Sequence, residues 1–498
     1  MEFMGAPRLL IVSDLDHTMV DHKDQLSLLR FGALWESEFN HDSLLVYSTG
    51  RSPTMFSDLR REVPLLTPGI AILACGSEIF YGDTMTQDFG FIDELNKGWN
   101  RAAVEEVAAE MNLKYQCDSE QRPHKVSFHV RKEESAHIMP MLREKLTAKG
   151  LDYKLIYSGG LDLDVLPRAA GKGQALSYLL KKLKAEGRAP QQTLVCGDSG
   201  NDIELFGVDN VYGVIVANAQ DELLQWHADQ LGDKSHIFVA TERCAAGIIQ
   251  AMQHFNLRPN VSPRDISVPL SVHDKLAPKP DGGAVSREVV EYLLLTEQWL
   301  RGDIDASEEA FRRLKFGLAK ESNRVCPWGV IENPHEEIDT LRAQHGSQKG
   351  KLFYIWADRV RSIKLSDDSW LVRFDKWERS DAGLTCVLTS ALLQANAEFP
   401  NGLYWRLIHE TWLKGYEGSA ALKGEGSVSI SGGGVRCVVL CFVFGREFCK
   451  KVLVRGRDHF LVWYNEFDRD ATVSCGYEVF VVSRLSFKEM VPFMLLGI

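Results

Sequence analysis

Two carboxylates, Asp14 and Asp16, directly follow a short apolar segment near the start of the sequence, residues 8–13 (RLLIVS). Side chains at positions i and i+2 leave an extended strand on the same side. One carboxylate could then attack a phosphorus atom, while the other protonates the leaving group and later activates water. Both could also present oxygen to a hard cation. The pair at the end of a strand therefore indicates phosphoryl-transfer chemistry.

Two further side chains are suited to holding a phosphate group. Thr49 closes a second apolar segment, residues 43–48 (SLLVYS), where a hydroxyl and nearby N–H groups could hold phosphate oxygens. Its alternative role is to cap the following helix. Lys172 lies in Ala-Gly-Lys-Gly at the start of a predicted helix, residues 172–186, where a cation would neutralise both phosphate and carboxylates. A solvent-exposed lysine is the alternative interpretation there.

A glycine-rich turn, residues 197–202 (GDSGND), carries a second pair of carboxylates, Asp198 and Asp202. Mg²⁺ prefers a few carboxylates together with waters and substrate phosphate oxygens. A structural turn built on Asp and Asn side chains is the alternative. Because the turn follows another apolar segment, residues 193–196 (TLVC), the position favours a metal site.

The elements that must position these residues alternate between apolar strands and helices. This alternation predicts an α/β fold with a doubly wound parallel sheet, in which ligands lie beyond the carboxyl ends of the strands. The predicted strands are 8–13, 43–48, 193–196 and 211–216, with further strand–helix alternation near 70–80, and the predicted helices include 26–38 and 172–186.

Residues 86–165 differ from this pattern and predict an inserted α/β cap. Strand-like segments 125–130 and 153–157 flank an amphipathic helix at 133–149. An insertion of this size in a doubly wound fold would cover the active site. The phosphatase core would then comprise residues 1–85 and 166–258.

The rest of the chain divides into three predicted parts. Residues 259–285 are rich in Pro, Gly and charged residues and indicate a linker. Residues 286–418 predict an α+β domain that opens with an amphipathic helix near Arg287, and residues 419–498 form a tail without a recognised motif. The strand-like segments of the domain are 351–364, 369–378, 384–393 and 402–412, and its predicted core tryptophans are 299, 328, 356, 370, 377, 405 and 412.

Composition narrows the class of protein. The 498 residues are 45% apolar and carry a formal net charge of −11, which disfavours nucleic acid as a partner. Ten scattered cysteines indicate a reducing compartment rather than a disulfide framework. We see neither a secretory leader nor a segment long enough to span a bilayer. We therefore expect a cytoplasmic protein that does not bind membranes.

The order and spacing of the four motifs resembles the haloacid dehalogenase superfamily. The resemblance implies a Rossmann-like core and a phosphatase that forms an aspartyl-phosphate intermediate. It makes Asp14 the nucleophile and Asp16 the general acid and base. It also implies that Thr49 and Lys172 stabilise the phosphate, and that Mg²⁺ is bound by Asp14, the Asp16 carbonyl and Asp198, with Asn201 and Asp202 supporting the metal shell.

A closer resemblance, which runs from about residue 8 to about residue 418, is to the plant-type sucrose-phosphatases. It rests on segments including SDLDHTMVDH, YSTGRSPT, AGKGQALSYLLKKLK and CGDSGNDIELF. The resemblance implies hydrolysis of sucrose 6-phosphate, the last step of sucrose synthesis. It also implies that the second domain is cone-shaped, like nuclear transport factor 2. Sucrose-phosphate synthase is an expected partner, and we expect the chain to form a homodimer.

We expect the cap to determine which sugar the enzyme accepts. Acid and amide groups suit polyol hydroxyls, and core loops beneath the cap could add contacts. For Lys125 a salt bridge within the cap is the alternative, and we interpret His17 and His124 as structural or cap-contact residues. The predicted substrate contacts are Arg51, Glu78, Lys125, Asp162 and Asp164.

Two other functions stay open from the sequence. One is a cap-type phosphatase for a different sugar phosphate, because phosphoryl chemistry does not determine the sugar. The other is a non-catalytic subunit that binds a sugar-phosphate synthase through the second domain. The intact motifs favour an enzyme, and because all of them precede residue 203 we expect the tail to be dispensable for catalysis.

Overall fold

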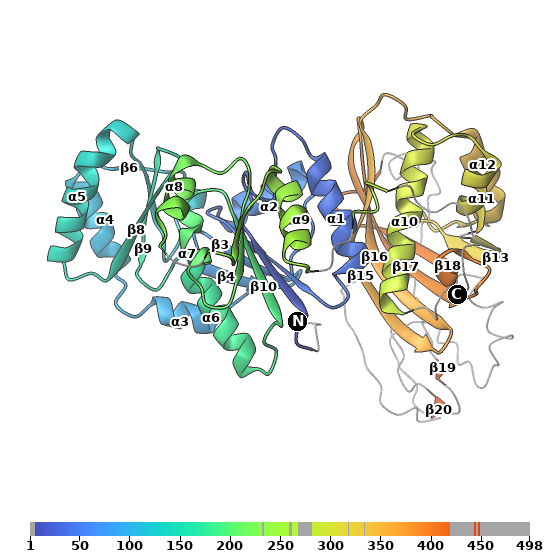
Figure 1. Ribbon diagram of the computed structural model, residues 1–498, viewed down its shortest axis with the longest axis horizontal. Coiled ribbons are helices and arrows are strands. Elements are labelled where there is room, and N and C mark those ends of the chain that lie inside the picture. The colour runs from blue at the N-terminus through green and yellow to red at the C-terminus, as the bar shows by residue number, and fades with distance from the viewer. Residues whose placement is uncertain are drawn as a thin grey trace, which may run out of the picture. The chain divides into compact units, whose positions relative to one another are not determined.

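An eight-stranded sheet forms the centre of the first half of the chain (Figure 1). The computed structural model describes residues 5–231, 234–257, 261–266, 281–316, 318–332, 334–418, 443–444 and 447–448. The strand order is β12-β11-β10-β1-β2-β3-β4-β5, parallel from β12 to β3. The strands are β1 (Leu9–Ser13), β2 (Leu44–Ser48), β3 (Ile70–Leu73), β4 (Glu78–Tyr81), β5 (Thr86–Gln87), β10 (Gln192–Gly197), β11 (Tyr212–Ile215) and β12 (Ile237–Val239).

Helices cover both faces of this sheet. Within β1, Leu9 and Ile11 pack in one hydrophobic cluster, with α1, α2 and α9, while Leu10 and Val12 pack in another, with α3, α6, α7 and α8. The helices are α1 (Leu26–Glu38), α2 (Pro53–Glu62), α3 (Phe89–Leu95), α6 (Lys172–Ala185), α7 (Ile203–Phe206), α8 (Asp221–Asp229) and α9 (Cys244–His254). The predicted doubly wound α/β architecture is confirmed, and the carboxyl ends of β1, β2 and β10 meet at one edge.

Residues 86–95, which we assigned to the cap from the sequence, lie on the large sheet instead. β5 pairs with β4, and Phe91 and Leu95 of α3 pack in the same cluster as Leu10. Asp88 explains the difference, because its carboxylate accepts a hydrogen bond from the Phe91 N–H at the start of α3 and another from the Lys182 ammonium of α6. This anchoring of α3 to the core was not apparent from the sequence.

The cap has its own four-stranded antiparallel sheet, ordered β6-β7-β9-β8. Two helices pack on one face, where Val126 and Phe128 of β7 meet Leu142 and Leu146 of α5. Ser127 and Asp164 lie directly opposite each other in the β7–β9 pair, on the other face. The cap elements are α4 (Arg101–Glu110), β6 (Lys114–Tyr115), a 3-10 turn (Asp118–Glu120), β7 (Val126–His129), α5 (Lys132–Ala148), β8 (Tyr153–Ser158) and β9 (Asp162–Pro167).

The second domain is a six-stranded sheet, ordered β14-β13-β18-β17-β16-β15, with three helices. The first helix begins at Gly282, inside the predicted linker, because the Asp281 carboxylate accepts the Ala284 N–H and caps it. The elements are α10 (Gly282–Arg301), α11 (Glu308–Phe316), β13 (Leu318–Val325), β14 (Ile331–Glu332), α12 (Pro334–Ala343), β15 (Phe353–Ser366), β16 (Ser369–Ser380), β17 (Gly383–Ala395) and β18 (Leu403–Trp412).

Most of the tryptophans predicted for this core are buried. Trp299, Trp370 and Trp405 share one hydrophobic cluster with α10, and Trp356 stacks on Trp377 in another. Trp412 is half-buried. The prediction for Trp328 is wrong: it lies in the turn between β13 and β14 and is 51% exposed.

Parts of the sequence prediction lie outside the described residues. The predicted linker is described only at 261–266 and from Asp281 onward, and the predicted tail only at β19 (Val443–Phe444) and β20 (Glu447–Phe448). Residues up to Gly418 form one compact unit. Among the described residues, no helix combines the length and apolar character needed to cross a bilayer.

A buried polar network joins the phosphatase core to the second domain. The Glu36 carboxylate of α1 accepts hydrogen bonds from the Val360 N–H of β15, at 2.9 Å, and from the Asn40 amide, at 2.7 Å. The Asp358 carboxylate accepts from the Thr67 N–H and hydroxyl. Burial, and then the charge of Asp358, raise the pKa of Glu36 from 4.5 to about 8.

Glu36→Gln should therefore change how stability depends on pH. A carboxyl whose pKa is raised by folding stabilises the native state fully below its unfolded pKa, and this contribution is lost as pH rises towards the folded pKa. Wild-type protein should lose stability relative to Glu36→Gln between about pH 4.5 and about pH 8. Urea unfolding across this range would measure the difference. Glu62→Gln, at an exposed position, is the matched control, and a stability difference between wild type and Glu36→Gln that stays constant with pH would contradict the network's role.

Candidate active site

Asp14 is the first residue after β1 and is 6% exposed. Its N–H donates to the Cys196 carbonyl of β10, at 3.1 Å, which ties the end of β1 to the neighbouring strand. The chain then turns sharply: the Thr18 N–H donates to the Leu15 carbonyl, and His17 adopts a φ of 62°. Asp14 is therefore held rigidly at the carboxyl edge of the sheet.

Lys172 contacts this carboxylate directly. It is the first residue of α6, is 1% exposed, and places Nζ 2.9 Å from Asp14 Oδ1 and 2.7 Å from Asp202 Oδ1. The alternative of a solvent-exposed lysine is wrong. Gly171, which precedes Lys172, has a φ of 129°, a backbone conformation that favours glycine.

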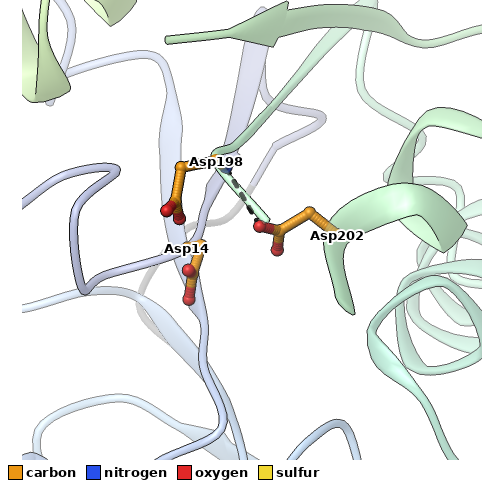
Figure 2. A group of neighbouring side chains, drawn as sticks. All are labelled: Asp14, Asp198 and Asp202. Atoms are coloured by element: carbon orange, nitrogen blue, oxygen red, sulfur yellow. Dashed lines mark hydrogen bonds between the residues drawn. The ribbon is translucent and has the colours of Figure 1, made fainter. Parts of the chain in front are cut away.

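The loop after β10 brings in two more carboxylates. Asp202 Oδ2 accepts hydrogen bonds from the N–H groups of Asp198 and Ser199, both at 3.1 Å, so Asp202 closes the turn on itself (Figure 2). The Thr18 hydroxyl donates to Asp198 Oδ1 at 2.9 Å. The Asn201 Oδ1 accepts from the Ser199 hydroxyl. The turn is thus both structural and placed against Asp14.

The carboxylates of Asp14, Asp198 and Asp202 form the cluster drawn in Figure 2, with candidate ligand oxygens within 4.8 Å of one another. Burial raises the pKa of Asp14 well above its usual value, with Lys172 opposing the shift and Asp202 and Asp198 adding to it. Burial and then Asp202 raise the pKa of Asp198 to about 6. Three buried carboxylates against one ammonium leave excess negative charge, which a divalent cation would neutralise.

Thr49 follows β2 and is buried. Its N–H donates to the Ile72 carbonyl, and its hydroxyl accepts the Arg51 N–H at 3.2 Å. The alternative role as a helix cap is wrong for Thr49, because Ser52 caps α2 through the Met55 N–H. Thr49 therefore lies at the same sheet edge as Asp14, on the adjacent strand.

Asp16 bonds to partners different from those of Asp14. Its carboxylate forms a two-pronged ion pair with the Arg51 guanidinium, both bonds 2.7 Å, and contacts His22 Nε2 at 2.8 Å. Burial alone would raise the pKa of Asp16, but the hydrogen bonds and charge of Arg51, with those of His22, lower it overall. Arg51, a predicted substrate contact, is thus paired with Asp16 in this structure.

Lys125 projects from the cap to the core. Its ammonium lies 2.7 Å from Glu120 Oε2, 3.4 Å from the Gly50 carbonyl and 3.7 Å from Asp164 Oδ1. The Asp164 carboxylate accepts the Ser127 hydroxyl and the Cys75 thiol. Burial would lower the pKa of Lys125, but Asp164 and the other acidic neighbours raise it. The cap lysine therefore lies against the loop that carries Thr49.

The remaining predicted substrate contacts, Glu78 and Asp162, lie in different surroundings. Glu78 does face the cap: it is buried and pairs with the Arg122 guanidinium at 2.8 Å. Asp162 is half-buried at the start of β9, where it pairs with His129 and Gln116. His124 Nε2 contacts the Asn96 amide oxygen at 2.9 Å, which fits a structural role, whereas the His17 side chain is exposed.

Sequence reasoning missed three residues that belong to this site: His22, Glu120 and Arg122. His22 lies six residues after Asp16 in the same segment, which was a usable signal. Glu120 lies five residues before Lys125 in the same segment, which was also a usable signal. Arg122 carried no such signal, because its partner Glu78 lies on the core, 44 residues away.

Two protein-family models match the chain. The model described as Sucrose-6F-phosphate phosphohydrolase matches residues 7–256, and the model described as Sucrose-6-phosphate phosphohydrolase C-terminal matches residues 285–414. Together they cover the phosphatase core, the cap and the second domain.

Individual proteins agree with these models. Sucrose-phosphatase 1 of Nicotiana tabacum is 50% identical over 418 residues, covering 83% of this chain and 97% of the tobacco protein. Probable sucrose-phosphatase 2 of Arabidopsis thaliana is 48% identical over 413 residues, covering 82% and 96%. The solved sucrose-phosphatase of Synechocystis sp., in complex with sucrose and phosphate, is 37% identical, covers 50% of this chain and 98% of that chain, and has a TM-score of 0.45. The chain therefore belongs to the sucrose-phosphatase family.

Proposed function

We propose that this enzyme hydrolyses sucrose 6-phosphate to sucrose and phosphate, the final step of sucrose biosynthesis, in a Mg²⁺-dependent reaction through an aspartyl phosphate on Asp14. The observation that carries the proposal is the buried contact of Asp14 with Lys172 beside Asp198 and Asp202. Family membership supports the choice of sugar phosphate.

The reaction has two halves. A carboxylate oxygen of Asp14 attacks phosphorus, and the bond from phosphorus to the sugar oxygen breaks while Asp16 gives that oxygen a proton. Asp16 then takes a proton from a water molecule, which attacks the phosphorus of the acyl phosphate and releases inorganic phosphate and free Asp14. Lys172 and Thr49 position the phosphate oxygens throughout.

The pairing of Asp16 with Arg51 suggests how substrate binding prepares the acid. Asp16 must carry a proton to act on the sugar oxygen, yet Arg51 holds its pKa low in this structure. A substrate phosphate, like a carboxylate, can be a bidentate partner for a guanidinium. Once Arg51 turns to the phosphate, burial raises the pKa of Asp16 and only His22 still opposes it.

Asp14 and Asp198 would hold Mg²⁺ with the Asp16 carbonyl, and Asn201 and Asp202 would support them. Bound there, Mg²⁺ would neutralise the carboxylates and polarise the phosphate. Asp202 Oδ2 already accepts hydrogen bonds from two backbone N–H groups, and Asp202 Oδ1 accepts one from the Lys172 ammonium. We therefore assign Asp202 mainly to holding the loop and the lysine in place.

Phosphate release from a panel of sugar phosphates tests the proposal. We expect a strong preference for sucrose 6-phosphate over trehalose 6-phosphate, glucose 6-phosphate and fructose 6-phosphate, and loss of activity in EDTA that added Mg²⁺ restores. Equal rates across the panel would be compatible with the proposed phosphatase chemistry but would refute the preference for sucrose 6-phosphate. Unchanged activity in EDTA would refute the proposed requirement for Mg²⁺.

Lys125, Glu78 and the cap aspartates Asp162 and Asp164 are the proposed sugar contacts, with Arg51 on the phosphate. Lys125→Met should raise KM for sucrose 6-phosphate about tenfold or more, because a hydrogen bond to a charged group contributes about 1.5–3 kcal/mol. Steady-state kinetics would measure it, with Lys149→Met on the cap surface as the control. An unchanged KM would contradict a contact between Lys125 and the sugar and would favour the salt bridge within the cap.

The small-molecule sugar phosphate is the partner that the site supports. The cytoplasmic location, the contact with sucrose-phosphate synthase and the homodimer stay predictions from the sequence.

A further inference from the structure

A second cavity lies away from the carboxylate cluster, between α2 and the β15–β16 face of the second domain. Its volume is about 240 Å³. Ligand pockets for drug-sized molecules commonly occupy about 300–1,000 Å³, so this one suits a smaller molecule. Exposed Ser57 and Arg61 of α2 line it, which leaves it open to solvent.

One wall of the cavity is aromatic. Trp356 and Trp377 face each other across β15 and β16, and their rings stack with centroids 6.0 Å apart and planes 7° apart. Tyr416 packs edge-on against Trp377 and also lines the cavity. Flat aromatic walls suit the apolar C–H face of a small ring, and their indole and phenol groups tolerate polar neighbours.

Backbone strain places a polar side chain in the same cavity. Arg359 has a φ of 58° within β15, at the point where the register with β16 shifts between Asp358 and Arg361. Such bulges redirect a side chain, and a left-handed conformation is costly for a residue with a Cβ. The Arg359 guanidinium reaches Asp83 of the core and Asp375, 2.7 Å from its Nε. This trio can both donate and accept hydrogen bonds.

The opposite wall carries two arginines, Arg60 and Arg61. Asp83 and Asp375 neutralise Arg359, whereas Arg60 has a neutral partner, the Thr67 hydroxyl, at 2.6 Å. Its buried Nε has no hydrogen-bond partner within the described structure. Arg61 is mostly exposed and holds Asp58 only at 3.4 Å. Two guanidiniums near the C-terminal end of α2 favour an anionic group such as phosphate.

We propose that this cavity binds a phosphorylated monosaccharide, with the sugar ring against Trp356, Trp377 and Tyr416, its hydroxyls on Arg359 and Asp375, and its phosphate on Arg60 and Arg61. The site is separate from the hydrolytic site. Helix α2 connects the hydrolytic site and the cavity. Its N-cap, Ser52, directly follows Arg51, and Arg60 and Arg61 lie in its last turn.

Equilibrium binding to the full chain tests the proposal independently of catalysis. The protein would carry Asp14→Asn and be kept in EDTA, so that no substrate turns over, and would be titrated with glucose 6-phosphate by calorimetry and tryptophan fluorescence. We expect saturable binding that Arg60→Gln and Arg61→Ala each weaken about tenfold or more. The matched control is Arg131→Ala, an exposed arginine on the cap that also pairs with an acid three residues away.

Two further readouts locate the ligand. Trp377→Phe keeps an aromatic wall but should remove most of the fluorescence change. Glucose and inorganic phosphate, tested separately, should each bind at least about tenfold more weakly than glucose 6-phosphate. Binding unaffected by Arg60→Gln and Arg61→Ala, or no saturable binding, would overturn the site. Equal affinity for glucose would overturn the assignment of a phosphorylated ligand.

Discussion

Asp14→Asn should lower kcat for sucrose 6-phosphate by about four orders of magnitude or more, because the amide has no anionic oxygen to attack phosphorus. The same change should raise thermal stability in EDTA. Burial and the charges of Asp198 and Asp202 disfavour the Asp14 carboxylate in the folded state, and the amide removes this repulsion. Phosphate-release kinetics and thermal unfolding would measure the two effects.

A control separates this loss from general damage to the loop. Asp24→Asn, ten residues later, also replaces a carboxylate by an amide and keeps an oxygen to accept the Leu26 N–H. Its activity should stay near wild type. An Asp14→Asn rate within tenfold of wild type would rule out Asp14 as the nucleophile.

Lys172→Met should have the second-largest effect, on stability as well as on turnover. Lys172 is the cation that contacts both Asp14 and Asp202, at 2.9 and 2.7 Å. Removing one partner of a buried ion pair costs about 3–5 kcal/mol. We expect a loss of that order in EDTA, partly restored by Mg²⁺, and a kcat lowered by about two orders of magnitude or more. Urea unfolding with and without Mg²⁺ would measure the stability.

Lys184→Met is the matched control on the same helix. Lys184 is exposed, so the change should cost at most about 1 kcal/mol. Equal destabilisation by the two substitutions, or no additional effect of Mg²⁺ on Lys172→Met, would contradict the assignment of Lys172 to the carboxylate cluster.

The positions of Asp14 and Thr49, two of the proposed catalytic residues, were predictable because each follows a fully buried strand. β1 and β2 appear in the sequence as short apolar segments, and parallel strands bring their carboxyl ends together. Asp14, Thr49 and Asp198 could therefore be placed at one edge without a structure. For Lys172 the local sequence left a solvent-exposed lysine open, and the family resemblance indicated its role.

The cap and core contacts were less predictable, because they join residues that are distant in sequence. Arg51 and Glu78 were expected to meet sugar, yet they pair with Asp16 and Arg122, 35 and 44 residues away. The Arg51–Asp16 pair forms where two core loops meet, and the Glu78–Arg122 pair forms only when the cap packs on the core. The sequence holds no periodic signal for them.

The second domain shows a limit of pattern reasoning. β13 was not predicted, because LAKESNRV lacks the apolar alternation that marks a half-buried strand. The strand forms through pairing with β18 instead. Trp328 was predicted as core from residue type alone, but its turn leaves it exposed. Tertiary pairing outweighs local preference at both places.

The most direct test of the account is to stop the reaction with acid during turnover of phosphorus-labelled sucrose 6-phosphate and to locate the label by mass spectrometry. The account predicts a covalent label on the peptide that contains Asp14, released by hydroxylamine as an acyl phosphate should be, and absent in Asp14→Asn. Turnover without label on wild-type protein, or label on a different residue, would contradict it.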